Sequence, residues 1–125
     1  MYQKVLVPLD GSEVAECTLP HLKSLFKEGA VGEVTLLNIV KIDIPWAEME
    51  SGQFNINAVR KQVFTSSKKY LAKVKSQLTS EGIKVEAVTV EAIGPAERIV
   101  DYAKKNSIDL IIMATHGYTG FKRLM

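Results

Sequence analysis

The sequence lacks most of the features that would place a protein in a special class at once. Its single cysteine, Cys17, excludes a disulfide within the chain and suits a reducing compartment. No apolar run approaches the roughly 18 residues that a membrane-spanning helix needs, and the N-terminus does not resemble a signal peptide. A net charge of +2 is too small to indicate nucleic-acid binding. We therefore expect a cytoplasmic protein that binds neither membranes nor nucleic acids.

What the chain does have is a regular alternation of two hydrophobic patterns. The 125 residues are 46% hydrophobic and 24% charged, which suits a single domain over residues 1–125. The predicted strands cover residues 5–9, 34–40, 85–92 and 110–114, and the predicted helices follow Ser12, span 58–81 and start at Pro95. This alternation predicts an α/β fold, with a three-layer, Rossmann-like arrangement of an open parallel sheet and helices on both faces.

The first predicted helix has clear end signals and a proline inside. Asp10-Gly11-Ser12 is a turn and N-cap signature, and Gly29 is the expected stop. Pro20 should either kink the helix or mark its true first turn. The predicted apolar face consists of Val14, Cys17, His21, Leu22, Leu25 and Phe26. We therefore expect His21 to be a packing residue rather than a ligand, and Ser12 to be a helix cap rather than a nucleophile.

The later elements have simpler patterns. The apolar stripe of helix 58–81 comprises Val63, Tyr70, Leu71, Val74 and Leu78, and the helix's lysines should form a solvated face. Strand 85–92 alternates apolar and polar residues, which predicts a position at the sheet edge. The third helix should bury Ile99, Val100 and Ala103. Residues 41–57, which include Trp46 and Phe54, show no clean period and are expected to form a flap or a functional lid.

The end of the first strand is the best candidate for a binding site. In open parallel sheets, ligands bind beyond the carboxyl ends of the strands, where the winding direction reverses. With strand order 3-2-1-4, the reversal places Asp10 opposite the glycine-containing loop 114–120. The carboxylate can accept from ribose hydroxyls or an adenine amino group, while the loop's backbone amides take the phosphates. An equally weighted alternative is that Asp10 only stabilises its own turn.

Three segments together carry a family resemblance. They are Val5-Leu-Val-Pro-Leu-Asp-Gly-Ser12, Gly94-Pro95-Ala96 and Asp109-Leu-Ile-Ile-Met-Ala-Thr-His-Gly117. In order and spacing, across the whole chain, they resemble the universal stress protein family. The resemblance implies an adenine nucleotide alpha hydrolase-like fold with five strands, a homodimer and a role in the stress response. It also implies that the fifth strand lies beyond Met125, outside this sequence.

The chain is more similar to the branch of that family that binds ATP or AMP. The motif of that branch is Gly-x-x-Gly, followed further along the chain by Gly-Ser or Gly-Thr. In this sequence Ala114 replaces the first glycine and Gly117 matches the second. The closing Gly-Ser or Gly-Thr pair would fall beyond Met125. The resemblance implies that the adenine and ribose lie at Pro8, Leu9 and Asp10. It also implies that the Val40 backbone bonds to the base, with Met113 packed nearby, and that Gly94 lies at the neighbouring strand tip. The phosphate loop would consist of Ala114, Thr115, His116 and Gly117. Mg²⁺ is expected only as a companion of the ATP phosphates.

These residues favour a nucleotide-binding regulatory protein over an enzyme. Phosphoryl transfer needs a positioned base, a cation clamp and metal ligands, and none of these can be named from the sequence. His116 has no adjacent carboxylate or nucleophile and is assigned to the loop. At most slow ATP hydrolysis is expected. The alternative is a protein of the same family that binds no nucleotide and acts through dimerisation and protein contacts.

Overall fold

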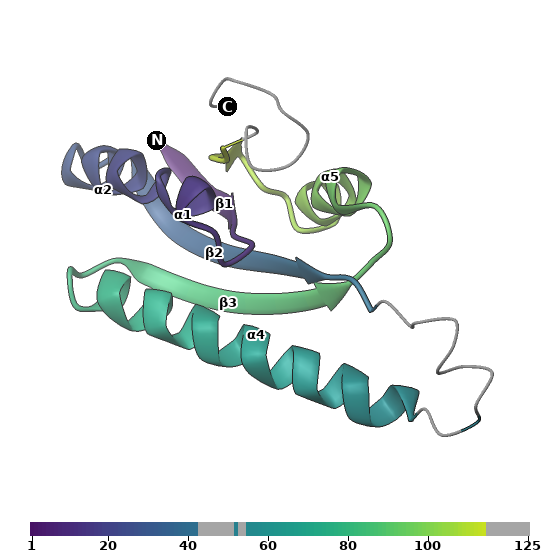
Figure 1. Ribbon diagram of the computed structural model, residues 1–125. Helices are drawn as coiled ribbons and strands as arrows, with labels where there is room; N and C mark the ends of the chain where they lie inside the picture. Colours follow the sequence, from purple (N-terminus) through teal and green to yellow (C-terminus); the bar gives the residue numbers. More distant parts are fainter. Residues whose placement is uncertain (43–51, 53–54, 115–125) are drawn as a thin grey trace.

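Four parallel strands form the sheet in the computed structural model, which describes residues 1–42, 52 and 55–114 (Figure 1). The strand order is β3-β2-β1-β4, so the predicted order is confirmed. The elements are β1 Tyr2–Pro8, α1 Glu13–Glu16, α2 Leu19–Lys27, β2 Val31–Val40, α4 Ile56–Thr79, β3 Lys84–Glu91, α5 Pro95–Lys105 and β4 Leu110–Ile111. None of the helices described is long and apolar enough to cross a membrane.

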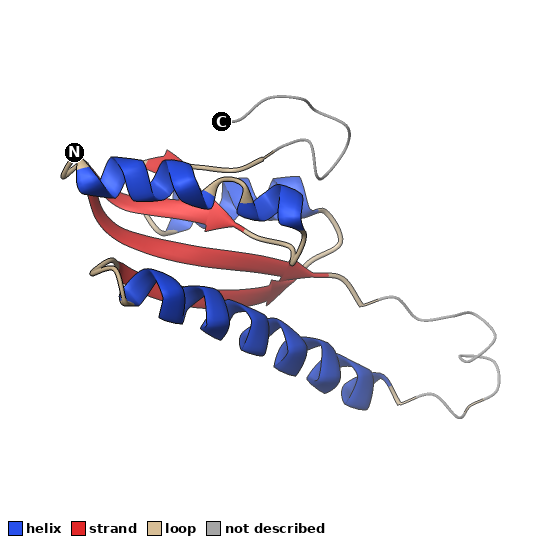
Figure 2. Ribbon diagram, turned by 60° about the vertical axis from the view of Figure 1, so that its left-hand side comes forward, coloured by secondary structure: helices blue, strands red, loops and turns tan. Residues whose placement is uncertain are grey.

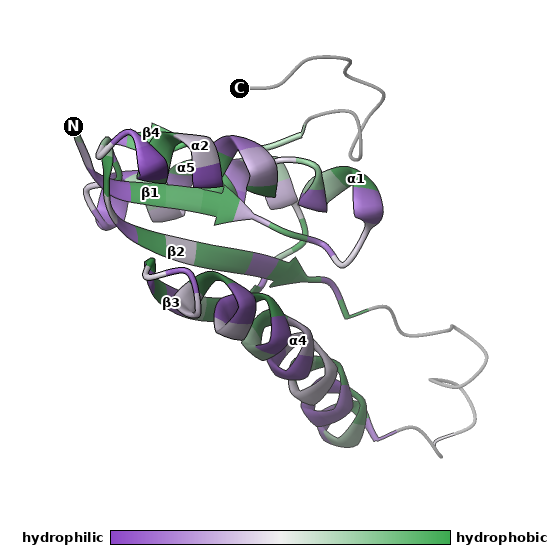
Figure 3. Ribbon diagram, turned by 90° about the vertical axis from the view of Figure 1, so that its left-hand side faces the viewer, coloured by the Kyte–Doolittle hydropathy of each residue, from purple (hydrophilic) through white to green (hydrophobic). Residues whose placement is uncertain are grey.

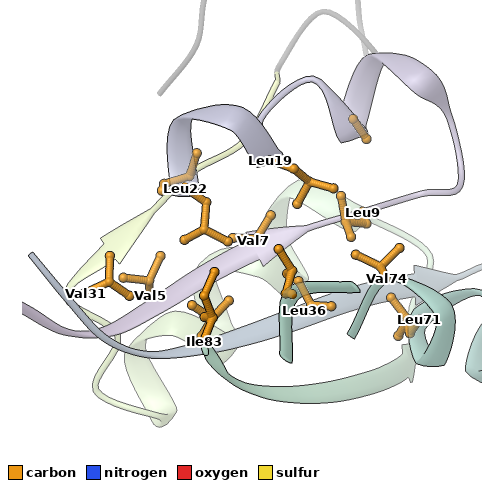
Figure 4. Packing of buried hydrophobic residues seen from close by; sticks show 14 residues of the cluster. Val5, Val7, Leu9, Leu19, Leu22, Val31, Leu36, Leu71, Val74 and Ile83 are labelled. Carbon is orange, nitrogen blue, oxygen red and sulfur yellow. The ribbon is translucent and has the colours of Figure 1, made fainter. Parts of the chain in front are cut away.

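Side chains that alternate along the strands divide the core into two layers. On one face of the sheet, Val5 and Val7 of β1 and Leu9, which follows the strand, pack in a cluster that includes buried residues of α1, α2 and α4 (Figure 4). On the other face, Leu6 and Leu37 pack with Ile99 of α5. Helices therefore cover both faces, as predicted, and Figure 2 shows the helices lying on either side of the strands.

The first predicted helix is two helices, which changes the face that is buried. Ser12 caps α1, because its Oγ accepts from the Ala15 N–H at 3.1 Å, and Pro20 lies in the first turn of α2. Between them Thr18 is fully buried, and its hydroxyl donates to the Ala15 carbonyl at 2.8 Å. The cap and the proline's first-turn role are confirmed.

The predicted apolar face of this segment is partly wrong. Val14, Cys17 and His21 are exposed, while Ala15, Leu19 and Leu22 are buried. The buried stripe includes Ala15 and Thr18, whose side chains are small and contribute little to a hydrophobic pattern. His21 is consequently a surface residue and not the packing residue that the pattern predicts.

Helix α4 follows its predicted stripe. Asn55 caps it by accepting from the Ala58 N–H at 3.1 Å. Leu71, Val74 and Leu78 are buried against the sheet. The chain then reverses at Gly82, whose φ of 89° is the left-handed conformation that glycine adopts without strain.

The later strands need two corrections. β3 lies at the sheet edge as predicted, but β4 spans only Leu110–Ile111, shorter than the predicted strand 110–114. Among the described residues β4 pairs with β1 alone. In α5, Ile99 is buried as predicted, whereas Val100 is 47% exposed because it points away from the sheet.

Candidate functional site

The carboxyl end of β1 is the point where the winding direction of the sheet reverses. β1 pairs with β2 on one side and with β4 on the other. Beyond β4, the Ile112 N–H donates to the Leu6 carbonyl at 2.9 Å, which continues the alignment towards Ala114. The chain that follows β4 therefore runs to the same edge as the Asp10 turn. Thr115, His116 and Gly117, the rest of the predicted phosphate loop, lie outside the described residues.

Asp10 uses one carboxylate oxygen within its own turn. Its Oδ1 accepts from the Ser12 N–H at 2.9 Å and from the Ser12 hydroxyl at 2.5 Å. Gly11 has a φ of 87°, which this turn requires and which a larger side chain would adopt with strain. Within the described part of the chain, Oδ2 has no hydrogen-bond partner, and Asp10 is exposed. The turn-stabilising role is thus present, and it leaves the second oxygen available to a ligand.

A cavity of about 440 Å³ opens beside this turn, between the ends of β1 and β2 and the first half of α4. Its lining residues are Asp10, Gly11, Asn38, Val40, Gln62, Val63, Ser66, Ser67 and Tyr70. They supply one carboxylate, two amides and three hydroxyls, and no lysine or arginine of the described ranges is among them. This chemistry suits an uncharged polar group, or a hydrogen-bond donor facing Asp10, better than a phosphate.

Asn38 and Ser67, which line the cavity, form a hydrogen-bonded network with Thr89, and we call these three side chains the polar floor. The Asn38 Nδ2 donates to the Ser67 Oγ at 2.8 Å, and the Ser67 and Thr89 hydroxyls lie 2.7 Å apart. Ser67 is only 5% exposed. The sequence analysis missed this network, although an asparagine within the apolar run 34–40 was a visible signal.

Tyr70 connects the cavity wall to α1. Its hydroxyl donates to the Glu16 Oε2 at 2.9 Å, which ties α4 to the short helix that follows the Asp10 turn. Burial first, and then the hydrogen bond to Glu16, raise the pKa of Tyr70 above its usual range. Sequence periodicity identified Tyr70 as a member of the apolar stripe but gave no sign of this bond.

The structure brings some of the predicted site residues together and separates others. Asp10 and Val40 both line the cavity, and the Val40 carbonyl also accepts from the Ala92 N–H at 3.1 Å. Pro8 is buried at the end of β1, and Leu9 is a core residue that is 1% exposed. Met113 packs with the cluster on the α5 face, and Gly94 is the N-cap of α5. Their ligand contacts stay predictions.

The described residues offer no ready-made metal site. Within those ranges, no three histidine, cysteine, aspartate or glutamate side chains lie close enough to hold a metal ion. Asp10 is the only carboxylate that lines the cavity. A Mg²⁺ ion that accompanies ATP would therefore need the phosphates and water as its main ligands, and it stays a prediction.

The strand order and the winding reversal define an open parallel α/β protein, with its candidate site at the carboxyl edge of the sheet. The chain belongs to the universal stress protein family, whose model, described as "Universal stress protein family", matches residues 1–125.

Individual relatives agree with this assignment. The universal stress protein MJ0577 of Methanocaldococcus jannaschii is 30% identical over 138 residues, covering 100% of this chain and 83% of that protein. Its solved structure superposes with a TM-score of 0.73 at 34% identity, covering 90% of this chain and 74% of that one. A universal stress family protein from Burkholderia pseudomallei has a TM-score of 0.74 at 23% identity, covering 93% and 83% of the two chains. A universal stress protein in complex with cAMP has a TM-score of 0.61 at 15% identity, covering 94% of this chain and 76% of that one.

Proposed function

We propose that this protein binds an adenine nucleotide, ATP or AMP, and acts as a regulatory protein of the stress response rather than as an enzyme. The observation that carries the proposal is the position of Asp10. Its carboxylate lies at the reversal point of the sheet, keeps one oxygen free of local hydrogen bonds, and borders a polar cavity. A carboxylate in this place is a suitable acceptor for ribose hydroxyls or the adenine amino group.

Two further lines support the proposal. A universal stress protein of the same fold was solved in complex with cAMP, which contains adenine and ribose. In this chain the loop that follows Ala114 begins at the same edge as Asp10, where backbone amides could take phosphate groups. On the family resemblance we also propose a cytoplasmic homodimer, which sedimentation of the purified protein would test.

The test is the affinity of Asp10 variants for ATP and AMP, measured by calorimetry. Asp10→Asn keeps an oxygen that can accept from Ser12 but removes the charge, so the turn should persist. We expect both Asp10→Asn and Asp10→Ala to lose about tenfold or more in affinity, because a hydrogen bond to a charged group is lost. Asp101→Asn, at an exposed position on α5, is the matched control and should bind like the wild type.

Two results would count against the proposal. Equal affinity of the wild type and both Asp10 variants would remove Asp10 from the site. No binding of either nucleotide by the wild type would favour the family alternative, in which the protein works through dimerisation and protein contacts.

A further inference from the structure

The polar floor lies where continued apolar packing would be expected. Along β2, Leu36, Asn38 and Val40 face the same side of the sheet, and Leu36 and Val40 are 0% and 8% exposed. On α4, Ser67 lies one turn before the buried Leu71. The three polar side chains come from β2, α4 and β3, so three elements place hydrogen-bonding groups at one point, next to the apolar packing of Leu36 and Leu71.

Stability of the fold does not account for this arrangement. A satisfied buried network contributes little more than apolar packing of the same volume, because its groups also give up hydrogen bonds to water. Leucine, alanine and valine at positions 38, 67 and 89 would extend the cluster that contains Leu36, Leu71 and Val74. A polar network at this place is therefore better explained by a ligand that hydrogen-bonds to it.

The network uses the amide nitrogen of Asn38 and leaves its amide oxygen available as an acceptor. Asn38 donates through Nδ2 to the Ser67 Oγ, and a hydroxyl oxygen that accepts this bond can pass its own proton to Thr89. In this arrangement the amide nitrogen of Asn38 faces Ser67, and its amide oxygen does not. Its Oδ1 has no hydrogen-bond partner among the described residues, and Asn38 lines the cavity.

We infer that the polar floor recognises the uncharged base-and-sugar end of the nucleotide, with the Asn38 Oδ1 accepting from an amino group of the base. The inference rests on the proposed function and deepens it. The cavity of about 440 Å³ lies within the range of small-molecule sites. Among the described residues, Asp10 is the single charged residue in its lining, so the cavity suits the uncharged end of the ligand and leaves the phosphates outside.

The first experiment compares two nucleotides that differ at one group. ATP carries an amino donor on its base, and inosine triphosphate carries an oxygen acceptor at the same place. We expect the wild type to prefer ATP by about tenfold or more, since an acceptor facing Asn38 Oδ1 would leave both groups unpaired. Asn38→Leu should bind ATP at least about tenfold more weakly and should lose the preference. Ser76→Ala, at an exposed position on the same helix, is the control and should behave like the wild type.

The second experiment measures stability without any ligand. The triple variant Asn38→Leu/Ser67→Ala/Thr89→Val should unfold at the same urea concentration as the wild type or a higher one. A clearly lower midpoint would show that the network is needed by the fold, and would overturn the inference. Urea unfolding followed by circular dichroism gives this midpoint for both proteins.

The binding results separate the two proposals. If the wild type binds ATP and Asn38→Leu binds both nucleotides as the wild type does, the inference is wrong and the proposed function stands. If the wild type binds none of ATP, AMP and adenosine, both are wrong. Weaker binding and lost preference in Asn38→Leu, together with an undiminished urea midpoint of the triple variant, would establish the recognition role.

Discussion

The two halves of helix α4 face the same sheet with different chemistry. In the second half, Leu71, Val74 and Leu78 are each no more than 2% exposed and belong to the main core cluster. In the first half, four residues line the cavity: Gln62 and Ser66, which are exposed, Val63, which is half-buried, and Ser67, which is buried. One continuous helix thus contributes to the core at one end and to the candidate site at the other. Figure 3 shows both hydrophilic and hydrophobic residues along α4.

The second half of α4 therefore contributes to the stability of the core, and the first half lines the candidate binding site. The helical period places inward-facing positions at the same spacing in both halves, so geometry does not require a serine at position 67 where the later positions hold Leu71 and Val74. The change occurs where α4 approaches the carboxyl edge of the sheet, next to Asp10 and Asn38. We therefore expect substitutions in the second half to affect unfolding, and substitutions in the first half to affect ligand binding.

The largest expected effect lies in the second half of α4. Leu71→Ala should lower the free energy of unfolding by about 2–5 kcal/mol, because Leu71 is 1% exposed and its loss leaves a cavity in the core. Val63→Ala, in the half-buried wall of the cavity, is the matched control and should cost no more than about 1 kcal/mol. Urea unfolding of both variants measures the difference. Equal losses of unfolding free energy in the two variants would show that both halves of α4 contribute equally to stability, which would contradict the difference proposed between them.

A smaller effect is expected at Tyr70, which lies where the two halves meet. Tyr70→Phe keeps the ring but removes the bond to Glu16, so the free energy of unfolding should fall by about 1–2 kcal/mol. Glu16→Gln keeps an oxygen that can accept from the hydroxyl, so it should cost less than Tyr70→Phe. A Glu16→Gln variant as unstable as Tyr70→Phe would contradict the role assigned to this bond.

The pH dependence gives a second check on Tyr70. Its raised pKa means that the folded state holds the phenol proton more tightly than the unfolded state does. The stability that the hydroxyl supplies is therefore fully present below about pH 10, the ordinary tyrosine pKa, and is lost as the pH rises towards the folded pKa. The stability difference between the wild type and Tyr70→Phe should shrink only above about pH 10. A difference that already shrinks near neutral pH would mean that another group is responsible.

Much of the fold could be predicted because long runs of one pattern dominate it. The apolar strand around Leu36 and the stripe that contains Leu71 have unambiguous periods, and strand–helix alternation leaves few topologies. Asp10 could be placed at the reversal point for the same reason. The order of the strands then determines which ends meet, without any knowledge of side-chain contacts.

Two kinds of feature could not be predicted from the sequence. One is the choice of buried face where two faces of a helix are similarly apolar, and the other is contact between residues far apart in the chain. In the segment that begins at Val14, two faces carry comparable apolar character, and the buried one contains Ala15 and Thr18, which no hydrophobicity count favours. The Asn38–Ser67 bond joins residues 29 positions apart, so it becomes visible only when β2 and α4 are packed. The predicted lid residues Trp46 and Phe54 lie outside the described residues and stay predictions.

The smallest expected effect concerns the ion pairs near the two ends of α4. Arg60 lies in the first half and pairs with Glu91 at 2.7 Å, while Glu81, just beyond the second half, pairs with Lys23 at 2.9 Å. The side chains of both pairs are 37–40% exposed, so water screens both attractions. Glu91 raises the pKa of Arg60, which keeps an already charged group charged and adds no pH dependence near neutrality. Neither Arg60→Ala nor Lys23→Ala should shift the urea midpoint or the ATP affinity resolvably.

The two variants form a matched pair, because they remove similar exposed bridges from opposite ends of the same helix. A lower midpoint for Arg60→Ala alone would mean that charge at the β3 edge holds the first half of α4 in place. Weaker ATP binding by the same variant, with an unchanged midpoint, would instead mean that Arg60 acts on the ligand through its charge. Salt separates these two outcomes from a general loss of packing, since raising the ionic strength should reproduce either defect in the wild type.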